Sequence, residues 1–149
     1  MMFALRSRSM LAGIGLAGAS VLAGCSQAKG AADAGALAGC YRTIQRASLA
    51  LQVARPDMTP EERRAASRQL GDARARLLQT WATHEGLTIS AEHFSNESAQ
   101  AAEFVEGVNA EAGLGEQERL STLSEAGDAP EKWREKLTAA FDCTDRLAS

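Results

Sequence analysis

The sequence predicts an all-α domain: a four-helix up-down bundle with one additional short helix, closed by one disulfide, after a cleaved signal peptide. Three observations support this. Ala, Leu, Arg, Glu and Gln dominate the chain, and these residues lose little side-chain freedom in a helix, whereas aromatic residues make up only 5%. Apolar residues recur at spacings of three and four over several segments. Two cysteines, Cys40 and Cys143, stand near opposite ends of the folded part.

The first 24 residues have the three-part organisation of a secretory signal. The segment 1–9 contains Arg6 and Arg8 and no acidic residue, and Met10–Leu22 is an apolar stretch of 13 residues. That stretch is short for a membrane span, which needs about 20 residues. An uncleaved N-terminal anchor is the alternative, but the shortness of the stretch and its many Gly and Ala residues favour a cleaved signal.

The apolar stretch ends in Leu22-Ala23-Gly24-Cys25, which resembles the lipobox of bacterial lipoprotein precursors. The resemblance implies that Cys25 becomes the first mature residue and attaches the protein to a membrane through N-terminal lipid. Ser26, not Asp, follows the cysteine, and in diderm bacteria this sorting pattern implies the outer membrane, facing the periplasm. The alternative is a small buried cysteine. Residues 25–36 are rich in Gly, Ala and polar residues, which predicts a flexible lipidated tether.

Residues 37–149 should form the bundle, and two helices begin it. The first is expected from about Gly35 to Ala54 and the second from Pro60 to Glu85. Thr59 and Glu62 have the spacing of a capping box, and Gly86 suits a left-handed helix end. The predicted core residues of these helices are Leu37, Cys40, Tyr41, Ile44, Ala47, Leu51, Ala54, Ala66, Leu70, Ala73, Leu77 and Trp81.

Three more helical segments are expected after residue 86. A third long helix should start at Ser90 or Ser95 and end near Ala112, before the glycines of segment 113–115. A short helical piece over 116–125 follows, with Leu120 and Leu123 as its apolar anchors. The last helix should cover 129–147, with a capping box formed by Asp128 and Glu131. The predicted core residues are Ala101, Val105, Val108, Ala112, Trp133, Leu137, Ala140, Phe141, Thr144 and Leu147.

The cysteines give an independent prediction of topology. Once Cys25 is assigned to lipid, Cys40 and Cys143 remain, and an even pair in an exported protein indicates a disulfide. Cys40 is near the start of the first helix and Cys143 near the end of the last. These two ends are neighbours in an antiparallel four-helix bundle. The predicted topology and the predicted bond therefore agree.

Charge is unevenly distributed along the chain. After residue 24 there are 14 basic and 19 acidic side chains, a balance that argues against nucleic-acid binding. Residues 29–76 hold nine basic and five acidic residues, whereas residues 77–131 hold one basic and eleven acidic residues. Solvated faces of neighbouring helices would explain this pattern. A face that receives a basic partner would also explain it. The candidate residues of such a face are Glu97, Glu103, Glu106 and Glu111.

No motif in the chain predicts catalysis. His84-Glu85 lacks the second histidine of H-E-x-x-H, because Thr88 stands at that position. His84, Glu85, Glu92 and His93 would form a metal cluster only if the connecting loop folded back. We therefore predict no catalytic residue, no metal, no cofactor and no small-molecule substrate. Trp81 and Trp133 are predicted to belong to the core.

These observations predict a lipid-anchored periplasmic interaction protein that is not an enzyme. It would serve as an adaptor or accessory subunit of an envelope assembly, with another envelope protein as its partner. The first alternative is an immunity- or exclusion-type inhibitor that binds a basic toxin or hydrolase through the acidic helix. The second alternative is a small-ligand carrier, or an enzyme, with a pocket inside the bundle.

Overall fold

The computed structural model describes residues 33–54 and 57–149. The expected signal peptide, Cys25 and residues 25–32 of the expected tether lie outside these residues. The described residues are all-helical and contain no strand. None of their helices combines the length and the apolar character needed to span a bilayer. The helices are α1 (Ala34–Val53), α2 (Pro60–His84), α3 (Ala91–Ser95), α4 (Ala99–Ala112), α5 (Glu116–Asp128), the short 3-10 helix η2 (Pro130–Lys132) and α6 (Trp133–Leu147).

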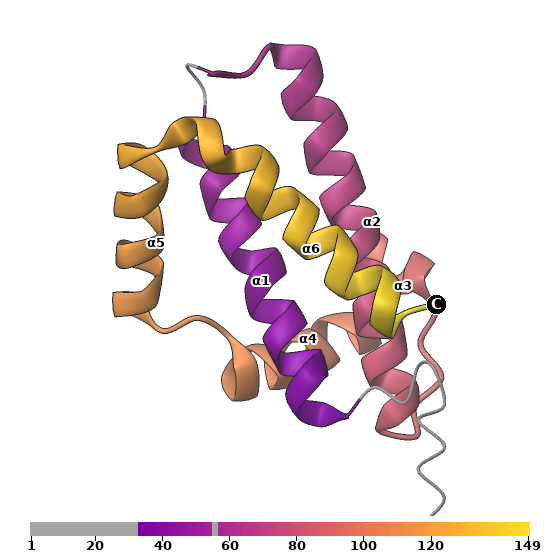
Figure 1. Cartoon of the computed structure of the whole chain (residues 1–149). Coiled ribbons are helices and arrows are strands. Elements are labelled where there is room, and N and C mark those ends of the chain that lie inside the picture. The colour runs from indigo at the N-terminus through magenta and orange to yellow at the C-terminus, as the bar shows by residue number, and fades with distance from the viewer. Residues whose placement is uncertain (1–32, 55–56) are drawn as a thin grey trace, which may run out of the picture.

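Three helices, α1, α2 and α6, pack against one another along their lengths and form the centre of the molecule. The helix α5 packs along another side of α1, and α4 crosses the end of the molecule where α1 begins (Figure 1). The four helices α1, α2, α5 and α6 alternate in direction along the chain, since α1 and α5 run one way and α2 and α6 run the other (Figure 1). The up-down alternation is therefore present, with α5 outside a three-helix centre.

The third bundle helix is not the one that the sequence predicted. The start expected at Ser90 is wrong, because the segment that follows it is divided into α3 and α4. The alternative start at Ser95 is closer to α4, which begins at Ala99 and ends at Ala112 as predicted. Glu97 adopts a φ of 51°, which breaks the helix, and the Ser98 hydroxyl accepts a hydrogen bond from Ala101 N at 3.3 Å to start α4. The expected short piece over 116–125 extends to Asp128 and takes the third position in the bundle.

The starts of α1 and α2 agree with the sequence to within one residue, whereas the start of α6 differs. The capping box of Thr59 and Glu62 is present, and Gly86 has a φ of 77°. Asp33 caps α1 by accepting from Ala36 N at 2.7 Å, so residues 34–36, which the expected tether of 25–36 included, are helical. The expected capping box of Asp128 is wrong, because Asp128 ends α5 and η2 precedes α6.

The contact face of α5 also differs from the expected one. Leu120, expected as an anchor, is 61% exposed, and the buried residues are Thr122 and Ala126. Glu118, one turn before Thr122, pairs with Arg42 and Arg46 of α1. Residues 118, 122 and 126 follow one another at four-residue spacing, so this face, and not the leucines, is turned toward α1.

The predicted core of the other helices is confirmed. Every residue expected in the stripes of α1 and α2 is buried. In α4 and α6 most are buried, and Val105, Phe141 and Leu147 are half-buried and packed against the core.

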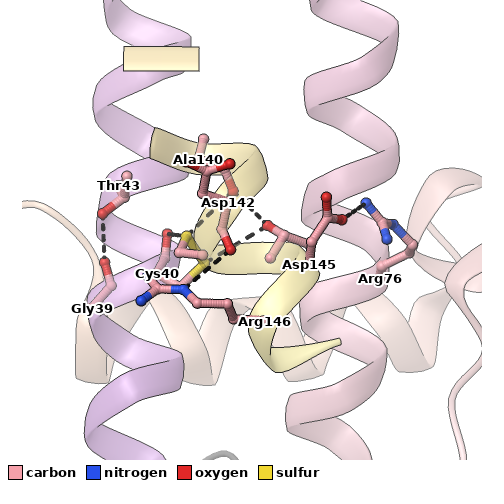
Figure 2. The surroundings of a disulfide bond; sticks show 10 residues. Gly39, Cys40, Thr43, Arg76, Ala140, Asp142, Asp145 and Arg146 are labelled. Atoms are coloured by element: carbon pink, nitrogen blue, oxygen red, sulfur yellow. Dashed lines mark hydrogen bonds and ion pairs between the residues drawn. A yellow bond between two sulfur atoms is a disulfide. The ribbon is translucent and has the colours of Figure 1, made fainter. Parts of the chain in front are cut away.

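The disulfide between Cys40 and Cys143 is confirmed. Their Cα atoms are 5.6 Å apart, and the bond joins the first turns of α1 to the last turns of α6 (Figure 2). Both cysteines are buried. The buried Thr144 hydroxyl beside the bond donates to the Ala140 carbonyl at 2.8 Å, so this buried polar group has a partner. An exposed ion pair of 3.0 Å between Arg76 and Asp145 links α2 to α6 two residues after Cys143 (Figure 2).

Candidate functional site

The four candidate glutamates lie on one helix and the turn before it. Glu103, Glu106 and Glu111 are on α4, and Glu97 is in the turn between α3 and α4; all four are exposed. Within residues 33–54 and 57–149, none of these carboxylates forms an ion pair. Their negative charge is therefore not neutralised by a neighbouring side chain of the described structure.

Two of the four glutamates border a groove of about 330 Å³ between the C-terminal end of α2 and α4. Its lining combines apolar side chains with the carboxylates of three glutamates. The lining residues are Trp81, Glu85, Leu87, Glu103, Phe104, Gly107, Val108 and Glu111. The structure thus brings Glu103 and Glu111 together with Glu85. It does not place Glu97 or Glu106 at this groove. We call it the acidic groove.

Local sequence explains how the groove forms. Gly86 adopts a left-handed conformation at the end of α2, and the next residue, Leu87, donates its backbone N–H to Ala82 O at 2.8 Å. Leu87 therefore turns back alongside α4 and stays 43% exposed. On α4, residues 103, 107 and 111 share one face, and Gly107 leaves its centre open. A Cβ atom at Gly107 would meet nothing within 4 Å.

Polar contacts from α1 hold the C-terminal half of α4. The Tyr41 hydroxyl donates to Asn109 Oδ1 at 2.7 Å, and Arg42 Nε donates to the Ala112 carbonyl at 3.2 Å. Just beyond α4, Leu114 N donates to Gln45 Oε1 at 2.9 Å. These bonds reach across about 70 positions of sequence and set the place of α4 relative to the bundle.

The residues considered as a metal cluster are separately placed. His84 and Glu85 are exposed at the end of α2, and the ring Nδ1 of His93 is 2.8 Å from Ser90 Oγ within its own short helix. Among residues 33–54 and 57–149, no group of three or more His, Cys, Asp or Glu side chains could hold a metal ion.

The two tryptophans are in the core, as predicted. Trp81 is 1% exposed and Trp133 is 7% exposed. The ring of Trp81 meets Tyr41 edge-to-face, with 6.2 Å between the ring centroids. Trp81 therefore lines the acidic groove as a buried core residue and is not an exposed binding platform.

Comparisons with protein-family models, with curated proteins and with solved structures find no match for this chain.

The sequence predicted the charge of this site but not its apolar part. Leu87, Phe104 and Gly107 line the acidic groove, and none of them stood out from the sequence as a binding residue. The leucine after a left-handed glycine was the available signal, because such a residue commonly contacts the end of the preceding helix. Its position beside α4 is a contact between two separate helices, which the local sequence pattern did not show.

Proposed function

We propose that this chain is the precursor of a lipid-anchored protein of the bacterial envelope, facing the periplasm, that binds another envelope protein without catalysing a reaction. The lipobox resemblance at Cys25 supports the anchor. The disulfide between Cys40 and Cys143 supports export, since disulfides persist in oxidising compartments. An adaptor or accessory subunit of an envelope assembly is the role that these features favour.

The acidic groove is the observation on which the binding role depends. Apolar residues at the centre of an interface supply affinity, and charges around them set orientation and steer association. Glu85, Glu103 and Glu111 supply such charges around Phe104 and Leu87. A partner segment with an apolar anchor between basic side chains fits this arrangement. Attachment of both proteins to one envelope would raise their local concentration and allow modest affinity to suffice.

Charge reversal at the groove tests the proposed binding surface. The variant Glu103→Lys/Glu111→Lys should reduce recovery of a crosslinked envelope partner by about tenfold or more, because opposed charges at an interface cost affinity. The control is Glu97→Lys/Glu106→Lys, which changes net charge equally but lies outside the groove. The control variant should recover the partner as wild type does. Equal loss in both variants would contradict the assignment to the groove.

An inhibitor that protects the cell from a basic toxin or hydrolase is the second candidate. The three carboxylates around the acidic groove favour it, because a hydrolase with a basic surface would be attracted there. The recovered partner separates the two roles. If this chain suppresses the partner's enzymatic activity and charge reversal restores it, the inhibitor role is supported. A partner without activity, or with unchanged activity, supports the adaptor role.

The lipid anchor has its own test. The variant Cys25→Ser should lose incorporation of an alkyne-tagged fatty acid, because the acylated sulfur is then absent. The variant Ser26→Ala, which leaves Cys25 in place, should retain the label. Continued labelling of Cys25→Ser would contradict the anchor while leaving the groove unaffected.

A further inference from the structure

A second groove runs over the surface of α1, separate from the acidic groove. It consists of two hollows of about 400 and 500 Å³ that share Ile44, Ser48, Gln52 and Arg74, so they are continuous. The helix α2 forms the wall of the first hollow. The C-terminal end of α4 and the beginning of α5 contribute to the second. No lining residue is common to this groove and the acidic groove.

Three arginines line this second groove, and no carboxylate does. Arg63 lies in the first hollow, Arg119 in the second, and Arg74 in both. In the part of the chain that the structure describes, none of the three forms an ion pair, although Arg42, Arg46, Arg64, Arg76 and Arg134 all do. The positive charge of this arginine groove is therefore unopposed within the described structure.

Arg63 also has an unmet hydrogen-bonding group. Its Nε atom is buried and has no acceptor among the described residues. Buried donors in folded proteins almost always have a partner, so the side chain of Arg63 retains hydrogen-bonding capacity that the described residues do not use. Ser48, Gln52 and Ser67 line the same hollow, and their side chains carry hydrogen-bond donors. They can donate to a ligand in addition to the arginine.

We infer that the arginine groove binds a small ligand with at least two phosphate or carboxylate groups. Guanidinium groups form paired, charge-assisted hydrogen bonds with both kinds of oxyanion. Arginines in both hollows and at their junction match anionic groups spaced along one ligand. The small side chains of Ser48 and Ser67, and the absent side chain of Gly71, leave room between the helices. This inference is independent of the partner proposed for the acidic groove.

Titration of the purified, disulfide-bonded protein with sodium pyrophosphate and with citrate, followed by amide chemical shifts, tests the inference. We expect saturable shifts at Ser48, Ser67 and Gly71. The variant Arg74→Gln should raise the dissociation constant by about tenfold or more, since it removes charge-assisted bonds. The matched control is Arg68→Gln. Arg68 is exposed on α2, lies outside both hollows, and forms no ion pair among the described residues.

A variant that fills the groove tests whether binding needs the space of the hollow, since it leaves all three arginine charges in place. A Cβ atom at Gly71 would meet nothing within 4 Å, so Gly71→Leu should fold while its side chain occupies the hollow. We expect this variant to keep its helical circular dichroism and its disulfide and to lose the saturable shifts.

The two probes distinguish the kind of anionic group. Tighter binding of pyrophosphate to the wild-type protein would assign phosphate as the ligand group, and tighter binding of citrate would assign carboxylate.

Three results would overturn the inference. The first is the absence of saturable shifts with both probes. The second is a set of shifts that lies outside the arginine groove. The third is an equal weakening by Arg68→Gln and Arg74→Gln, which would indicate general charge attraction and not a defined site.

Discussion

At the residue scale, Gly113 has the tightest surroundings of the described glycines. A Cβ atom there would lie 2.5 Å from the backbone oxygen of Asn109, a distance that real Cβ atoms do not reach. The Gly113 N–H donates to that same oxygen at 3.0 Å and ends α4. The side chain of Asn109 in turn accepts from Tyr41. A side chain at position 113 would therefore disturb the contact that holds α4 to α1.

The substitution Gly113→Ala should destabilise the protein by about 1–3 kcal/mol, the usual cost of a backbone shift that relieves a steric clash. Urea denaturation monitored by circular dichroism measures this change. The control is Gly127→Ala in α5, where a Cβ atom would meet nothing within 4 Å. Alanine should stabilise that helix by up to about 1 kcal/mol. Equal effects at the two positions would show that the clash does not govern Gly113.

At the element scale, the start of α2 depends on a pair of reciprocal hydrogen bonds. Thr59 Oγ1 accepts from Glu62 N at 3.1 Å, and Glu62 Oε2 accepts from Thr59 N at 2.8 Å. The bond from the Thr59 backbone is the main reason that the pKa of Glu62 is lowered, and Arg134 also lowers it. Arg134 is on α6, 3.3 Å from Glu62 Oε1, so the cap also links α2 to α6.

This lowered pKa predicts the pH dependence of stability. Because the folded pKa of Glu62 is below its unfolded value, its contribution is fully present above the unfolded pKa of about 4.3. The contribution is lost as the pH falls through the lower, folded pKa. Urea denaturation between pH 7 and pH 3 should therefore show a smaller acid-induced loss in Glu62→Gln than in wild type. Glu61→Gln, which leaves the cap intact, should follow wild type. A Glu62→Gln profile identical to wild type would contradict the prediction.

The packing of whole elements also explains why α4 suits a binding role. It buries only Ala101, Val108 and Ala112, and polar bonds to α1 hold its C-terminal half. The remaining face carries the carboxylates and borders the acidic groove. A helix with a narrow buried stripe leaves more of its surface for a partner than α1 or α2 does.

At the scale of the whole molecule, the disulfide fixes the first helix to the last. Cys40 and Cys143 are 103 positions apart, so the bond closes nearly the entire folded chain into a loop. In the chain-entropy account, a cross-link over about 100 residues restricts the unfolded state and stabilises the fold by up to about 4–5 kcal/mol.

Removal of the disulfide by Cys40→Ala/Cys143→Ala should lower the free energy of unfolding by up to about 4–5 kcal/mol. Urea denaturation of the variant and of the oxidised wild type gives the difference. Wild type unfolded in the presence of reductant should approach the variant, since it lacks the same cross-link. A loss below about 1 kcal/mol would show that the cross-link contributes little to stability.

The sequence by itself determined the features that depend on local spacing. The buried stripes of α1 and α2 follow from apolar residues three and four positions apart, and the capping box at Thr59 and the turn at Gly86 follow from single residue types. The disulfide followed from two cysteines near the chain ends of an antiparallel bundle. The sequence also showed that residues 77–131 carry a surplus of acidic side chains. The four candidate glutamates of this segment are exposed in the structure.

Only the tertiary structure decided which helix completes the bundle and which glutamates meet at the groove. The segments of α4 and α5 bury mostly small residues, so their apolar patterns are weak. Local spacing therefore does not show which of the two helices packs along α1. The turn at Glu97 and the bonds from Tyr41 and Arg42 direct α4 across the end of the bundle. Those contacts join residues about 70 positions apart. Their effect therefore depends on the folded arrangement of distant segments, which local sequence patterns do not specify.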